Sequence, residues 1–410
     1  MQPILVVIAL VLYTTFSSIS IAAIPIFTRT LNISPGDLFT ILFVLSRVIK
    51  ALIQIPNKII TQRPPAVIRF LYAYIFLAVV FFLSTLLFFL THNELVPYFA
   101  RSLFNYLLWC IALVLFYYGS DSQSKIKELR LISWLLMGSL VLGVLSNILI
   151  DTSVEDFFKL IMDTFKSSQV RLGGQVGDPN QLGALAAFFS IIGIMGVLHE
   201  QRYNAKLVYS ILTAGTGLIL VLTQSRESIL TLFVAILCIF IFLLRSQQYG
   251  KAFVILLGLS LGSALVLINI PRFIETLTAV TVGDTKYALS DRGQVWHTAL
   301  QIISTYPMGI GFETMYLISN NTVQQAHNAF LQSALLAGYV GLFAFLGFII
   351  CLIKLLWDQK KLVSNNWMLE AYFVFLVGYL VTSLWSDHFI SFYTFNAIFF
   401  GLLGFVVQAH

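Results

Sequence analysis

The chain has 410 residues, of which 59% are hydrophobic and 10% are charged, with a formal net charge of +6. A soluble domain carries about 25% charged residues, so this composition excludes a soluble protein and indicates one that spans a membrane. The basic excess does not indicate nucleic-acid binding, and we expect no nucleic-acid partner. The three cysteines lie in apolar runs and show neither metal-ligand spacing nor a disulfide framework.

Apolar runs of about 20 residues recur along the whole sequence, and each is long enough to cross a hydrocarbon core of about 30 Å. Because the runs are continuous rather than alternating, they predict helices. The predicted fold class is an all-α integral membrane protein with a single polytopic domain over residues 1–410. We expect about twelve transmembrane helices, at residues 3–26, 37–55, 67–90, 98–118, 131–150, 181–198, 207–223, 228–245, 252–270, 327–353, 369–385 and 389–408.

The lysines and arginines are distributed unevenly between alternate loops. If the N-terminus is cytoplasmic, 15 of the 24 basic residues lie on cytoplasmic loops or helix ends. The positive-inside rule favours this orientation, so we expect both termini in the cytoplasm and two long outer loops at residues 151–180 and 271–326. The other nine basic residues then lie on the outer face: Arg29, Arg101, Lys159, Lys166, Arg171, Arg226, Arg272, Lys286 and Arg292.

Both long outer loops contain helical patterns of their own. Apolar residues recur at helical spacing within residues 151–168, with acidic residues opposite, which predicts a helix lying in the membrane interface. In the second loop, Ser290 or Asp291 can cap another helix, and Pro307 can end it. The apolar face of that second helix consists of Val295, Ala299, Ile302 and Ile303.

The first polar motif, VRLGGQVGDPNQLG, contains Arg171, Asp178 and Asn180 and precedes the helix expected at 181–198. Its glycines permit close backbone approach, and Asp178 or Asn180 can cap the helix. A capped turn and a substrate-binding loop are equally consistent with this motif.

Two further arginines lie at helix starts on the outer face. Arg226, in LTQSRESIL, lies so close to apolar runs that it needs a partner, which Glu227 or a ligand anion could supply. Arg292, in SDRGQVW, lies in the first turn of its helix, where a cation opposes the helix dipole. A planar guanidinium suits phosphate oxygens. The alternatives are snorkelling toward lipid headgroups for Arg226 and a solvated charge for Arg292.

The stretch QQAHNAFLQSALLAG places His327 in the first turn of the helix expected at 327–353. The positive end of a helix and nearby arginines disfavour imidazolium, so we expect a neutral histidine that can accept a proton as a general base. A hydrogen-bonded interfacial histidine is the alternative. In WSDHFI, His388 beside Asp387 is the reserve candidate.

Four motifs, RLGGQVGDPNQLG, LTQSRES, DRGQVWHTALQIISTYPMGIGF and AHNAFLQSALLAGYVGL, resemble in order and spacing the bacterial O-antigen ligase and polymerase superfamily. The resemblance covers about residues 160–345. It implies a multi-helix glycosyltransferase of the GT-C type in the bacterial inner membrane, with its active site on the periplasmic face. The donor would be a glycan on undecaprenyl diphosphate. A ligase transfers that glycan to lipid A-core, and a polymerase transfers it to another growing glycan.

The resemblance also implies roles for individual residues. Arg226 and Arg292 would engage the donor diphosphate, Arg171 is a weaker third candidate, and His327 would activate the acceptor hydroxyl. The remaining candidate site residues are Asp178, Asn180, Asn328, Asp387 and His388. We expect no cofactor and no metal, because no acidic cluster and no phosphate-cradling glycine loop occurs. A single base acting opposite the leaving group implies inversion at the anomeric carbon.

Two alternatives remain open. Long outer loops fit a polymerase, whereas the pattern of one base and two arginines fits a ligase, which we slightly favour. A transporter of the same lipid-linked glycan would also need outer arginines, but transporters often have internal repeats and ionisable groups near the membrane midplane. Here the polar residues gather at one face and no repeat is evident, so the transporter is the less favoured alternative.

Overall fold

The computed structural model describes residues 2–16, 22–26, 29–33, 35, 38–42, 64–92, 99–120, 126–151, 171–173, 178–269, 292–312, 325–362 and 366–407. The chain divides into two compact units. Unit 1 comprises Met1–Leu129, Gln294–Asn366 and Leu384–His410, and unit 2 comprises Arg130–Gly293 and Trp367–Ser383. Two of the four divisions fall inside helices α5 and α13, and the other two lie on either side of α16.

Unit 1 contains most of the elements near the two termini. They are α1 (Gln2–Phe16), β1 (Ala22–Ile26), β2 (Arg29–Ile33), α3 (Pro65–Thr91), α4 (Phe99–Gly119), α13 (Arg292–Thr305, from Gln294 on), α15 (Ala329–Leu362), α17 (His388–Ser391) and α18 (Tyr393–Val406).

Unit 2 contains the central helices of the chain together with one helix from its C-terminal part. They are α5 (Ile126–Asp151, from Arg130 on), α7 (Pro179–His199), α8 (Tyr203–Thr223), α9 (Arg226–Arg245), α10 (Tyr249–Asn269) and α16 (Trp367–Thr382).

The prediction of an all-α membrane protein is confirmed. Within the described part of the chain, seven helices are long and apolar enough to cross a membrane, namely α3, α4, α5, α7, α8, α9 and α15. Shorter apolar helical stretches lie in α1, α10, α16 and α18. The amphipathic helix expected before Pro307 is also present as α13, whose buried residues are Ala299, Ile302 and Ile303. The interfacial helix expected within residues 151–168 lies outside the described residues, apart from Asp151, which ends α5.

The first expected span, at residues 3–26, was wrong at its C-terminal end. The helix ends at Phe16, and residues 22–26 form a strand that pairs antiparallel with residues 29–33. Pro25 lacks the N–H that a helix interior requires, and the β-branched residues around it favour a strand. Most of the second expected span, at 37–55, lies outside the described residues, and only 38–42 of it are described as helical.

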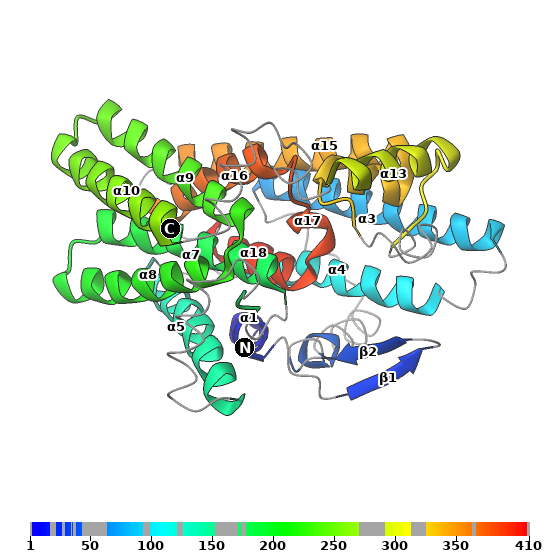
Figure 1. Ribbon diagram of the computed structural model, residues 1–410, viewed down its shortest axis with the longest axis horizontal. Coiled ribbons are helices and arrows are strands. Elements are labelled where there is room, and N and C mark those ends of the chain that lie inside the picture. Colours follow the sequence, from blue (N-terminus) through cyan, green and yellow to red (C-terminus); the bar gives the residue numbers. More distant parts are fainter. Residues whose placement is uncertain are drawn as a thin grey trace. The chain divides into compact units, whose positions relative to one another are not determined.

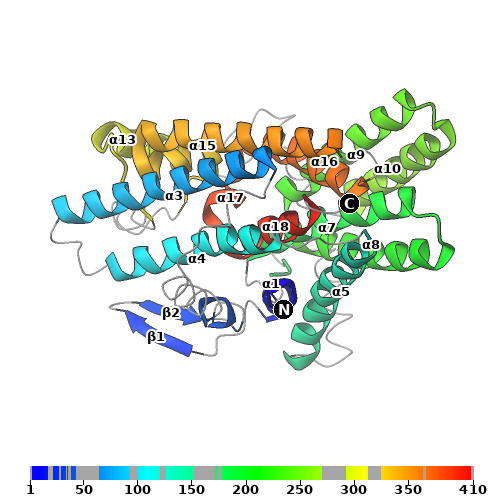
Figure 2. The same ribbon diagram turned by 180° about the vertical axis from the view of Figure 1, so that it is seen from behind.

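Unit 1 is held together by two helix pairs, α3 with α15 and α4 with α18, which lie side by side in both views (Figures 1 and 2). Aromatic rings fill the space between them. Phe70 of α3 lies 4.9 Å from Phe116, 5.4 Å from Phe348 and 6.0 Å from Phe400, measured between ring centroids. Such ring pairs contribute beyond their buried area, so a membrane helix bundle with little hydrophobic driving force gains packing energy here.

Helix α15 is broken near its start, where Ala337 and Gly338 leave helical geometry. The break releases backbone carbonyls, which are costly to leave unpaired in an apolar setting. The loop after α13 pairs with them: the N–H of Ile310 donates to Leu335 O at 2.7 Å and the N–H of Gly311 donates to Leu336 O at 3.0 Å. Gly338 has φ +60°, and a Cβ there would lie 1.8 Å from the carbonyl oxygen of Pro307. Only glycine fits this position.

Unit 2 is built around α7, which is buried along most of its length and packs against α8, α9 and α16. At the C-terminal end of α7, Glu200 forms an ion pair with Arg130 of α5 at 2.6 Å. Helix α16 joins the unit through α9, where the hydroxyls of Thr231 and Thr382 lie 2.8 Å apart. These contacts join α5 and α16 to the helices at the centre of the unit.

Candidate functional site

Arg171 is anchored from two sides in unit 2. Its Nε donates to the carbonyl oxygen of Thr223 at 3.0 Å, and its Nη2 donates to Oδ1 of Asn180 at 2.7 Å. The N–H of Leu172 also donates to Leu222 O at 3.0 Å. The segment before α7 is therefore bonded to the last turn of α8, and the half-buried Arg171 guanidinium is held between them.

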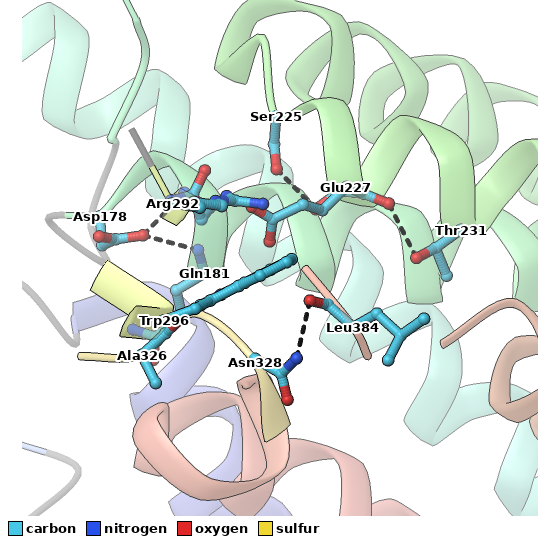
Figure 3. Close-up of polar contacts among 12 residues, drawn as sticks. Asp178, Gln181, Ser225, Glu227, Thr231, Arg292, Trp296, Ala326, Asn328 and Leu384 are labelled. Carbon is cyan, nitrogen blue, oxygen red and sulfur yellow. Dashed lines mark hydrogen bonds and ion pairs between the residues drawn. The ribbon is translucent and has the colours of Figure 1, made fainter. Parts of the chain in front are cut away.

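Asp178 caps helix α7. Its carboxylate accepts hydrogen bonds from the backbone N–H groups of Asn180 at 2.7 Å and Gln181 at 2.8 Å (Figure 3). Pro179 occupies the first helical position, where its missing N–H costs nothing. Of the two caps expected from the sequence, Asp178 takes that role, and the Asn180 side chain instead accepts from Arg171.

The first turn of α7 packs closely on the turn between α8 and α9. A Cβ on Gly183 would lie 2.7 Å from Cβ of Ser225 and 2.9 Å from Oγ of Ser228, so a larger residue would push the two elements apart. Gln224 ends α8 in the left-handed conformation, with φ +48°. This geometry lets α9 begin at Arg226, only three residues after α8 ends at Thr223.

The α8–α9 turn also holds the partner of Arg292. The guanidinium of Arg292 is ion-paired with the carboxylate of Glu227, the second residue of α9 (Figure 3). Both side chains are largely shielded, with 16% of Arg292 and 8% of Glu227 exposed. Ser225, the residue that precedes α9, makes no side-chain cap hydrogen bond. The positive end of α9 therefore lies among Arg226, Glu227 and Arg292, which favours an anion.

His327 lies in unit 1, and its expected position in the first turn of a helix was wrong. Helix α15 begins at Ala329, and Oδ1 of Asn328 accepts from the N–H groups of Phe330 and Leu331, both at 3.0 Å. Because Asn328 supplies the cap, His327 stands outside the helix, half-buried, with φ +48°.

The reserve candidates Asp387 and His388 also lie in unit 1. Asp387 is buried and accepts a hydrogen bond from Oγ of Ser391 at 2.5 Å, which closes the short helix α17. The next residue, His388, begins α17, and the side chain of His388 is not among those that the structure describes. The backbone carbonyl of Asp387 also accepts from the N–H groups of Ile390 at 2.8 Å and Ser391 at 2.9 Å.

Residues 208–346 match the model of the O-antigen ligase family. Over this segment, about a third of its length, the chain is similar to O-antigen ligases. No curated protein matches the chain. The family supports glycan transfer of the O-antigen ligase or polymerase type in general, with a lipid-linked glycan and an acceptor as substrates, in a multi-pass membrane protein.

The O-antigen ligase domain includes Arg226, Arg292 and His327, whereas Arg171 precedes it and Asp387 follows it. The structure brings Arg171, Asp178 and Asn180 together at the start of α7 and pairs Arg292 with Glu227, all within unit 2. His327, Asn328 and Asp387 belong to unit 1.

Two residues that sequence reasoning missed lie next to His327 along the hydrogen-bond network, Trp296 and Gln332. Nε1 of Trp296 donates to Ala326 O at 3.0 Å, and Oε1 of Gln332 accepts from Ala326 N at 2.9 Å. A tryptophan on a short amphipathic helix has a polar atom that needs a partner, and an amide inside an apolar helix needs one too. The sequence therefore shows that both side chains need a hydrogen-bond partner, but it does not show that the partner is Ala326.

Proposed function

We propose that the O-antigen ligase domain makes this chain an inverting, metal-independent glycosyltransferase of the bacterial inner membrane. It transfers a glycan from undecaprenyl diphosphate to a sugar hydroxyl on the periplasmic face. The proposed acceptor is lipid A-core, so that the reaction completes lipopolysaccharide. A polymerase that extends a growing O-antigen or exopolysaccharide glycan is the second candidate, favoured by the two long loops expected on the outer face.

The observation that carries this proposal is the set of guanidinium groups around the α8–α9 turn. Arg171 is bonded in place by Thr223 and Asn180, and Arg292 is held by Glu227. Arg226 begins α9, at the positive end of that helix. A diphosphate carries charge that increases as it leaves, and groups already fixed in position stabilise such charge without reorganising.

The proposed reaction is a direct displacement at the anomeric carbon of the donor sugar. The acceptor hydroxyl oxygen forms a bond to that carbon while the bond to the diphosphate oxygen breaks. The electron pair leaves with undecaprenyl diphosphate, and the hydroxyl proton passes to the imidazole of His327. Because diphosphate is a good leaving group, the usual second acid of glycoside hydrolysis is not needed. The guanidinium groups of Arg226 and Arg292 take the role that a metal ion has in many other phosphate-transferring enzymes.

The experiment that tests the proposal is a transfer assay with purified protein and a defined glycan on undecaprenyl diphosphate. Lipid A-core is offered in one arm and a second lipid-linked repeat unit in the other. Product in the first arm supports the ligase, and product in the second supports the polymerase. Movement of the intact donor across a proteoliposome membrane, without product in either arm, would instead identify a transporter.

A further inference from the structure

His327 has a backbone conformation that its surroundings must enforce. In the described part of the chain, three residues other than glycine have φ in the left-handed region: Gln224, Gln247 and His327. Gln224 and Gln247 lie in tight turns between consecutive helices. A side chain with a Cβ disfavours this region, and residues held in it mark sites where the surrounding structure fixes the backbone.

The residue before His327 is held by two side chains. Ala326 is fully buried. Its carbonyl oxygen accepts from Nε1 of Trp296 at 3.0 Å (Figure 3). Its N–H donates to Oε1 of Gln332 at 2.9 Å. Both backbone polar groups of one residue are thus occupied by side chains from different helices, α13 and α15.

The residue after His327 is held as firmly. Asn328 caps α15 through its oxygen, and its Nδ2 donates to the carbonyl oxygen of Leu384 at 3.1 Å (Figure 3). The backbone N–H of Gln332 donates to Asn328 O at 2.8 Å. Gln332 therefore bonds to both neighbours of His327, to Ala326 through its side chain and to Asn328 through its backbone.

The apolar surroundings keep these bonds away from water. Ala326 belongs to a buried cluster with Ala299 and Ile303 of α13 and with Leu335 of α15, and Val295 packs against that cluster. Gln332 itself is 7% exposed. Hydrogen bonds in such low-dielectric surroundings are strong when satisfied and costly when lost. The half-buried His327 side chain therefore extends from a backbone that hydrogen bonds hold on both sides.

We infer that Trp296 and Gln332 are positioning residues for the transfer reaction, because they hold the His327 backbone in its left-handed conformation and so fix where the imidazole lies. This inference rests on the proposed role of His327 as the base. A general base must lie within hydrogen-bond reach of the proton it removes, and a misplacement of about 1 Å can reduce a rate about a hundredfold. Neither side chain touches substrate in this scheme.

The test compares matched variants of the purified full-length protein. Trp296→Phe removes the indole N–H and keeps an aromatic ring, and Gln332→Met removes the acceptor and keeps the length of the side chain. We expect each to lower kcat by about tenfold to a hundredfold, with the KM for the lipid-linked donor unchanged. Gln332→Glu retains an acceptor oxygen and should recover most of the rate. Trp357→Phe, an exposed tryptophan on α15, is the control and should leave kcat unchanged.

The same variants are then made in the His327→Ala background. If Trp296 and Gln332 act through His327, their substitution causes no further loss there, since effects of residues that act as a unit are not additive. Equal fold-losses in both backgrounds, or no loss in either, would overturn the inference while leaving the proposed base in place. Full transfer by His327→Ala alone would overturn the proposed base, and this inference with it. Thermal unfolding of each variant in detergent separates a lost fold from a lost rate.

Discussion

The carboxylate of Glu227 and the guanidinium of Arg292 form a shielded ion pair between the first turn of α9 and the first turn of α13. The sequence had suggested Glu227 as one possible partner for its neighbour Arg226, and the structure pairs it with Arg292. Arginine has five N–H donors, so one carboxylate satisfies only part of its capacity. The proposed donor site uses the N–H groups of this guanidinium that Glu227 does not occupy.

The first prediction concerns the stability of this pair. Glu227→Gln leaves the shielded Arg292 charge without its counter-ion, and removing one partner of a buried pair costs about 3–5 kcal/mol. Because both side chains retain some exposure, we expect about 3 kcal/mol, measured as a lower thermal midpoint in detergent. The control is Asp358→Asn, which removes the exposed pair with Arg69 and should cost at most about 1 kcal/mol. Equal shifts in the two variants would contradict a structural role for the Glu227–Arg292 pair.

The second prediction separates charge from geometry at the arginines. Arg226→Lys and Arg292→Lys keep the positive charge and lose the planar pair of donors that binds phosphate oxygens. We expect donor affinity and transfer to fall in both variants. Arg245→Lys, at the opposite and exposed end of α9, serves as the matched control and should behave as the unmodified protein. Transfer near the unmodified rate in both test variants would indicate that these arginines do not bind the donor.

The third prediction concerns the base. His327→Ala should lower the transfer rate by about two to four orders of magnitude, the usual contribution of a positioned general base. Donor binding should remain, because the arginines are intact, and a chelator should not change the rate. His297→Ala, an exposed histidine of α13, is the control. Should donor binding fall together with transfer, His327 would be structural or donor-binding. If instead transfer persists, Asp387 and His388 become the next candidates for the base.

The fourth prediction tests the orientation expected from the basic residues. Thiols are introduced one at a time, at Gln301 of α13 and at Lys361 near the end of α15, in a background from which Cys110, Cys238 and Cys351 have been removed. Both positions are exposed, so burial cannot explain a difference in labelling. An impermeant reagent applied to spheroplasts should label Gln301→Cys and reach Lys361→Cys only after permeabilisation. The reverse pattern would place the long loops in the cytoplasm.

The fifth prediction concerns the break in α15. In Gly338→Ala the added methyl would meet the Pro307 carbonyl in a backbone conformation that alanine rarely adopts. We expect a loss of about 3 kcal/mol or more, seen as a lower thermal midpoint. Gly347→Ala, in the same helix but with open space around it, should be neutral or slightly stabilising. Comparable midpoints for the two variants would mean that the break rearranges at little cost.

Sequence reasoning located the transmembrane helices well because their signal is a continuous apolar run. The expected helix at 67–90 corresponds to α3, and the one at 181–198 corresponds to α7. The predicted ends of helices were wrong where a single side chain determines where the helix begins or ends. Asn328 caps α15, so His327 lies before the helix and not in its first turn. The strand that includes Pro25 replaces the end of the first expected helix.

The candidate site was predicted less completely. The sequence singled out Arg171, Arg226 and Arg292 through the cost of placing charge beside apolar runs, which is a local property. The pairing of Arg292 with Glu227, and the bonds from Trp296 and Gln332 to Ala326, join residues at least six positions apart. Such pairings depend on how helices pack, and the spacing of residues within one helix does not contain that information.

The break at Ala337 and Gly338 divides α15 into a long segment suited to cross the membrane and a short segment bonded to the rest of the protein. Residues 339–357, which contain Lys354 as their one charged residue, extend about 29 Å at 1.5 Å per residue and so nearly match a hydrocarbon core of about 30 Å without the segment before the break. In a thicker or thinner bilayer the longer segment adjusts its tilt. The shorter segment, which begins beside His327, is instead fastened through Leu335 and Leu336 to the loop after α13. We therefore expect hydrophobic mismatch to be absorbed on one side of Gly338, with the depth of His327 set by hydrogen bonds and not by the thickness of the membrane.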